Sequence, residues 1–312
     1  MPRELPAALA LAALLIIVAI AAPAFFRGSN LADLILNNLP ALVAAAGMTL
    51  VILAGHIDIS VGSQFAICSV AAGLLAKAGM PIPVVILGAA LAGAALGAIN
   101  GALVARAGIP SIVVTLATMI ALRDALRWAT EGQWVRDLPA GFQWMGLGQS
   151  IGGFMLTMIA LVVFGLAWAL RHLAAGRQLY ATGSNAEGAR LVGIRTHSVT
   201  AGAFILCGAF TGLAAVLNTV RFAEVQSNAG MGLEMKAIAA VVVGGAAITG
   251  GRGSMLGTLI GAALLGVAGT ALAYLGVNSA WERALQGAII LAAVASSGIS
   301  RKRVAEPVRS TA

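Results

Sequence analysis

The residues best placed for chemistry lie in one interrupted apolar segment. Residues 55–63 read GHIDISVGS, so an acid, two serines and two glycines stand where an apolar helix would be continuous. An ionised carboxylate facing lipid is costly, so Asp58 is expected to face a protein interior, a cavity or the interface. One hypothesis makes Asp58, with Ser60, Gly62 and Ser63, part of a gate or path for translocation across the membrane. The other makes Asp58 or Ser60 an N-cap of the following helix, and both can hold.

A second apolar segment, residues 235–249, is also interrupted. Glu234 and Lys236 stand at its start, and Gly244 and Gly245 lie within it. About 15 residues at about 1.5 Å each cover about 22 Å, less than the roughly 30 Å of bilayer hydrocarbon. So short a segment is tolerated where it lines a protein-walled cavity. We therefore add Glu234, Gly244 and Gly245 to the predicted gate or path, with an internal ion pair or an interfacial position as the alternative for Glu234.

The sequence indicates no catalytic, cofactor or metal site. It contains no GxxxxGK[ST] phosphate loop, no HExxH pattern and no paired Cys/His ligand set. Cys68 and Cys207 each lie in an apolar run, which is typical of packing residues. The chain is therefore predicted to be neither an enzyme nor a cofactor carrier.

The composition places the chain in a lipid bilayer. Of its 312 residues, 60% are hydrophobic and 10% are charged, against about 25% charged in a typical soluble domain. The net charge of +8 does not indicate nucleic-acid binding, because the basic residues lie in short gaps between apolar runs and near the C-terminus. That distribution follows the positive-inside rule and predicts that both termini are cytoplasmic.

The pattern predicts an all-α integral membrane protein with one transmembrane domain over residues 1–312 and a basic cytoplasmic tail at 299–312. Asn100 and Asn218 lie inside spans and are expected to form interhelical hydrogen bonds. The first apolar run, residues 5–22, could instead be a signal peptide that is cleaved. About ten spans are expected, near residues 5–22, 39–55, 59–77, 83–105, 109–127, 151–170, 199–219, 235–249, 255–275 and 281–298.

A faint internal repeat has a constant offset of 168 residues. Residues 93–96 match residues 261–264, and Gly62 falls on Gly230. The matching spans are five apart, so the repeat would be inverted, and inverted repeats with broken helices indicate a transport path between the two halves. Alanine and glycine are common in this chain, so a chance match is the alternative.

The most polar stretch between spans, residues 171–198, is predicted to be a cytoplasmic loop. Ser184 or Asn185 can cap a short helix that has Glu187 in its first turn and Gly193 near its end. Such an amphipathic helix is suited to docking in a partner's groove. A solvated loop is the equal alternative.

These segments together resemble the permeases of bacterial ATP-binding-cassette (ABC) importers for ribose, xylose, rhamnose and autoinducer-2. The resemblance rests on residues 55–63, 176–194 and 230–257 and extends over nearly the whole chain. His56 and the pair Ala246-Ala247 depart from the usual pattern. Residues 131–139 and 180–183 are most similar to the rhamnose and autoinducer-2 branch.

The resemblance implies a pore subunit in the bacterial inner membrane, working with a second permease in a homo- or heterodimer. It also implies ABC ATPase subunits that carry ATP and magnesium, and a periplasmic sugar-binding protein. A secondary transporter or channel without an ATPase is the alternative, with Asp58 and Glu234 as ion-coupling candidates. The ATPase-coupling residues that the resemblance implies are Gly176, Arg177, Tyr180, Gly183, Asn185, Glu187, Arg190 and Gly193.

Overall fold

The structure is a computed structural model that describes residues 4–143, 149–222 and 224–275, together with residues 281, 284, 287 and 288. Helices dominate this part of the chain, and a single bridge between Val135 and Val225 is the one extended pairing found there. The helical elements are α1 (Leu5–Ala21), η1 (Pro23–Phe26), α2 (Gly28–Leu53), α3 (Val61–Lys77), α4 (Ile82–Ala105), α5 (Ser111–Ala129), η2 (Ala140–Phe142), α6 (Gln149–His172), α7 (Ala174–Ser184), α8 (Ala186–Leu191), α9 (Thr196–Thr219), α10 (Leu233–Val243) and α11 (Met255–Tyr274).

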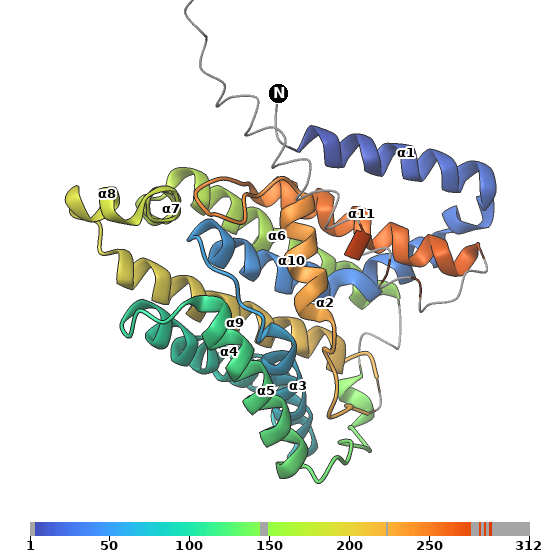
Figure 1. Cartoon of the computed structure of the whole chain (residues 1–312). Coiled ribbons are helices and arrows are strands. Elements are labelled where there is room, and N and C mark those ends of the chain that lie inside the picture. Colours follow the sequence, from blue (N-terminus) through green and yellow to red (C-terminus); the bar gives the residue numbers. More distant parts are fainter. Residues whose placement is uncertain are drawn as a thin grey trace, which may run out of the picture.

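Glycines bring α4 and α9 together, in the most extensive helix contact of the described residues (Figure 1). The backbones of Gly93 and Gly208 touch, so that a Cβ added to either would overlap the carbonyl oxygen of the other. One turn further along, Gly97 packs on the carbonyl of Phe204, and Gly212 packs on α4 in the same way. Both helices thus carry glycines four residues apart, the small-xxx-small spacing that lets membrane helices approach closely.

Large apolar side chains project outward from several helices. Ile20 of α1, Leu87 of α4 and Phe164 of α6 are each at least 60% exposed. A soluble surface does not hold so many exposed large aliphatic residues, whereas a lipid-facing surface does. The outward apolar faces therefore confirm a membrane protein.

The number of spans differs from the prediction. By length and composition, four described helices can cross a bilayer (α2, α4, α9 and α11), or up to five if the bent pair α6–α7 is one span. The prediction of about ten spans is therefore not confirmed. The apolar helices α1 and α3 have only 17 residues each, and the end of α5 is charged. The last predicted span, 281–298, and the tail, 299–312, lie almost entirely outside the described residues.

Both predicted helix breaks are present. The chain leaves α2 at Leu53 and re-enters a helix at Val61, and α10 has only 11 residues before the non-helical stretch 244–254. At about 1.5 Å per residue, α10 covers about 16 Å. A third break was not predicted: α7 bends by 71° from the preceding helix segment, Leu156–His172. The inverted repeat stays a prediction.

Two predicted boundaries were wrong. Helix α2 begins at Gly28 rather than near residue 39, so its first turns carry polar residues that a hydropathy window rejects. The stretch 171–198, predicted to be a loop with one short helix, is mostly helical, because it contains α7 and the first turn of α9 as well as the predicted helix, α8.

Candidate functional site

A buried hydrogen-bond network surrounds Asp58, which lies in the break between α2 and α3 and has no exposed surface. Asp58 Oδ1 accepts from the backbone N–H of Ser60 at 2.9 Å and from its hydroxyl at 2.5 Å. Asp58 Oδ2 accepts from the Gln64 amide nitrogen at 3.2 Å. The carboxylate therefore fixes the turn that leads into α3. Its backbone donor, Ser60, precedes the first helical residue, Val61, so this bond is not the N-cap predicted for Asp58.

The Ser60 hydroxyl is the centre of this network and has no capacity left for capping. It donates to Asp58 and accepts from Gln64 and from Asn100 of α4, each at 2.8 Å. One donated and two accepted bonds use the full capacity of a hydroxyl. Ser60 is the N-cap of α3 but makes no side-chain cap bond, so that part of the prediction was wrong. The interhelical bond predicted for Asn100 is confirmed.

Gly62 permits a close contact between the two broken segments. A Cβ at Gly62 would overlap Glu234 Oε2 and lie 2.6 Å from the carbonyl oxygen of Gly230. Glu234, in the first turn of α10, is 8% exposed. Its Oε1 accepts from the N–H of Gly232 at 3.2 Å, whereas its buried Oε2 has no hydrogen-bond partner in the described structure. The two interruptions thus meet around one buried carboxylate.

The other predicted gate or path residues lie at helix contacts. Ser63 donates to the carbonyl of Met119 in α5 at 2.8 Å, which fixes α3 to α5. Gly244 packs against the backbone of Gly257 in α11, and Gly245 follows with a φ of 94°. Their role in gating stays a prediction.

Helix α7 contacts both breaks at one backbone junction. Gly183 packs so closely on the end of α2 that a Cβ there would overlap the carbonyl oxygen of Leu53. That same carbonyl accepts from the N–H of Gly251, in the stretch after α10, at 2.9 Å. The Tyr180 hydroxyl donates to the carbonyl of Gly253 at 2.9 Å. A displacement of α7 therefore acts directly on the end of α2 and on the non-helical stretch between α10 and α11.

The short helix predicted after α7 is confirmed as α8. Asn185 is its N-cap, and the side-chain oxygen accepts from the N–H of Gly188 at 2.9 Å. Glu187 stands in the first turn, and Gly193, with a φ of 83°, follows the end of the helix. The Arg190 guanidinium donates to the Thr196 hydroxyl at 2.8 Å, which ties α8 to α9.

The remaining residues of the predicted ATPase-coupling set stabilise the bend that leads into α7. Gly176 packs directly on the carbonyl of Leu170 in α6. Arg177 donates to the carbonyl of His172 at 3.0 Å. Both contacts cross the 71° bend, so they set the direction in which α7 leaves α6.

Exposed apolar residues distinguish α8 from an ordinary solvated loop. Leu191 is 86% exposed and Val192 is 76% exposed, whereas Ala189 is buried. Figure 1 shows α7 and α8 at one end of the bundle, far from residues 130–143 at the other. Two adjacent exposed aliphatic side chains are typical of a contact with a protein or with the membrane.

Two features were missed at the sequence level. Gln64 completes the Asp58 network, and its spacing of four residues from Ser60 on one helix was the available signal. The glycines four residues apart in α4 and α9 were also visible in the sequence. No group of His, Cys, Asp and Glu that could hold a metal is found within the described ranges.

Comparison with known proteins identifies the family. Residues 30–294 match the family model described as branched-chain amino acid transport system / permease component. The chain is 36% identical over 294 residues to the ribose import permease protein of Escherichia coli K12, covering 92% of this chain and 91% of that protein. It is 38% identical over 261 residues to the autoinducer 2 import system permease protein of Salmonella choleraesuis, covering 82% of this chain and 74% of that protein.

No solved structure matches the chain. The family match nevertheless spans both helix breaks, the Asp58 network and the helices α7 and α8. The resemblance noted from the sequence is therefore confirmed, and the chain belongs to the branched-chain amino acid transport system permease family, alongside permeases of sugar importers.

Proposed function

We propose that this chain is the pore-forming permease subunit of a bacterial ABC importer for a monosaccharide or a related small polyol signal, with rhamnose-type and autoinducer-2-type compounds favoured. The contact of Gly183 with Leu53 carries the proposal. Gly183 lies near the end of α7, which leads directly into the exposed helix α8, so the contact connects α8 with the interrupted segments inside the bundle. The names of the related ribose and autoinducer 2 import permeases support the substrate class.

In this proposal the chain pairs with a second permease, and a periplasmic sugar-binding protein delivers the substrate. ABC ATPase subunits, which carry ATP and magnesium, dock on α7 and α8. The chain itself supplies no hydrolytic chemistry. The interrupted segments around Asp58, Ser60, Gly62 and Glu234 form the path or gate that ATPase motion opens.

Docking on α8 supplies a direct test. The tagged chain is co-expressed with its candidate ATPase and purified in mild detergent. A double variant, Leu191→Asp with Val192→Asp, is expected to lose the ATPase, because two carboxylates replace the exposed apolar contact. Met80→Asp, in the exposed turn between α3 and α4, is the matched control and should retain it. Retention of the ATPase by the double variant would refute docking on α8.

The alternative is a secondary transporter or channel, with Asp58 or Glu234 coupling ions. Uptake by proteoliposomes that contain the chain without any ATPase, driven by an ion gradient, would establish that alternative. The relatedness to import permeases does not favour it.

A further inference from the structure

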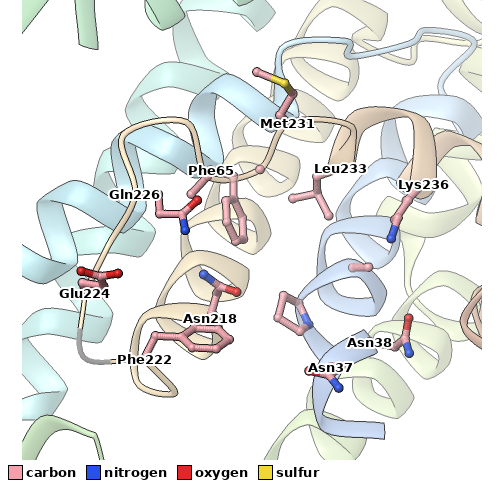
Figure 2. A pocket seen from close by; sticks show the side chains of 14 residues that line it. Asn37, Asn38, Phe65, Asn218, Phe222, Glu224, Gln226, Met231, Leu233 and Lys236 are labelled. Carbon is pink, nitrogen blue, oxygen red and sulfur yellow. The ribbon is translucent and has the colours of Figure 1, made fainter. Parts of the chain in front are cut away.

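One cavity of about 400 Å³ lies away from the Asp58 network, between α2, α3, the loop after α9 and the start of α10. Small-molecule sites typically enclose roughly 300–1,000 Å³. Figure 2 shows the side chains around this space, contributed on one side by α9 and its following loop and on the other by α2 and α10. The cavity is thus large enough for one small ligand.

Carboxamides are the main polar groups of the lining. They belong to Asn37 and Asn38 of α2, Asn218 of α9 and Gln226 of the following loop. The Asn38 amide nitrogen donates to the carbonyl of Leu34 at 2.8 Å. Within the described part of the chain, the side chains of Asn37, Asn218 and Gln226 make no hydrogen bond. Asn218 therefore does not form the interhelical bond predicted for it and instead faces the cavity (Figure 2).

The chemistry of this lining fits an uncharged polyol. A carboxamide donates and accepts hydrogen bonds, as a sugar hydroxyl does, so each pair can bond in either direction. Phe65 and Phe222 add ring surfaces for the C–H face of a sugar. The lining carries one acid, Glu224, and one base, Lys236, so it has no net charge with which to attract an anion. Glu224 also lies 3.8 Å from the Arg136 guanidinium outside the cavity.

The cavity adjoins the interrupted segments. Gly230 lines it, and the carbonyl of Gly230 lies against Gly62, beside the unpartnered Glu234 Oε2. Phe65, one turn after Gly62 on α3, lines it as well. The cavity therefore shares Gly230 with the contact between Gly62 and the buried carboxylate of Glu234.

We infer that this cavity is a binding subsite for a neutral monosaccharide or polyol, and that Asn218 and Gln226 are its recognition residues. The inference rests on the proposed function, since it places transported sugar in front of the contact between Gly62 and Glu234. It also goes beyond that function, because it assigns sugar recognition to the permease itself.

Two measurements separate this subsite from the proposed function. D-ribose and L-rhamnose are titrated into the purified full chain, and binding is followed by saturation-transfer-difference NMR. ATP-driven uptake of the same sugars is measured in proteoliposomes that contain the whole transporter. The test variant is Asn218→Leu with Gln226→Leu, and the control is Asn228→Leu, an exposed amide in the same loop that does not line the cavity.

The double variant is expected to lose at least about tenfold in affinity for the bound sugar, because two amide partners are removed, while the control retains binding. If the wild-type chain binds neither sugar, the subsite is overturned. Equal binding by the double variant and the Asn228→Leu control would overturn it as well. If ATP-driven uptake then persists, the proposed function survives without the subsite. Sugar binding at these amides without ATP-driven uptake would support the subsite and remove the proposed function.

Discussion

Replacing Gly183 by alanine should uncouple α7 from the interrupted segments. The added methyl group would overlap the carbonyl oxygen of Leu53 and lie 2.6 Å from the backbone nitrogen of Gly251. Both neighbours are backbone atoms, so α7 itself has to move. Movement of α7 breaks the hydrogen bond of 2.9 Å that the Tyr180 hydroxyl donates to the carbonyl of Gly253.

The size of the effect follows from these contacts. Overpacking a tight contact costs about 1–3 kcal/mol, and each lost hydrogen bond adds about 0.5–1.5 kcal/mol. With one hydrogen bond lost, we therefore expect Gly183→Ala to lower the free energy of unfolding by about 1.5–4.5 kcal/mol. The functional expectation is that ATP hydrolysis by the assembled transporter continues while sugar uptake falls, because motion at α8 no longer reaches the ends of α2 and α10.

The assay compares Gly183→Ala with Gly202→Ala, a helical position in α9 where an added Cβ meets nothing within 4 Å. Both proteins are purified for thermal unfolding in detergent and are reconstituted with the ATPase for uptake. The control should be at least as stable as the wild type, since alanine favours a helix over glycine by about 0.5–1 kcal/mol. If Gly183→Ala matches this control in both stability and uptake, the junction has no role in coupling.

Three further substitutions test separate parts of the structure. Asp58→Asn should cost about 1–3 kcal/mol of stability, because an amide in place of one carboxylate oxygen faces the donating nitrogen of Gln64; an unchanged melting temperature would contradict the network. Glu187→Arg should abolish uptake while membrane insertion, followed by fractionation, stays normal, because it reverses the charge in the first turn of α8; wild-type uptake would remove Glu187 from the ATPase contact. Gly93→Val should destabilise the chain by about 1–3 kcal/mol through overpacking. Gly165→Val should not, because a Cβ at Gly165 meets nothing within 4 Å. Equal melting temperatures of the two variants would rule out glycine-mediated packing of α4.

The sequence by itself determined the features that depend on short stretches of chain. The apolar surplus requires a bilayer whatever the fold, because it cannot be covered by the few charged residues. The acid and glycines of residues 55–63 break a helix locally, and Asn185 caps α8 through an amide only three residues away. The family resemblance was also readable, since its motifs are contiguous.

Helix bounds were less predictable where polarity and helicity disagree. A hydropathy window finds spans through their apolar content, so it missed the first turns of α2, which are helical but carry Asn37 and Asn38. The same window gave no sign of α7, which forms within residues 171–198 outside any apolar run, although α8 in that stretch was predicted from its cap. Helix formation and lipid preference are separate properties, and the window measures only the second.

Tertiary structure alone decided which residues meet. Gly183 reaches Leu53 and Gly251 across 130 and 68 residues of chain, and Gly62 reaches Glu234 across 172. Asn100 and Asn218 looked alike in sequence, but one bonds to Ser60 and the other faces a cavity. Nearly uniform apolar helices such as α4 and α11 present no polar face from which their packing could be inferred. The partners of each residue were therefore fixed by backbone contacts that only the assembled bundle creates.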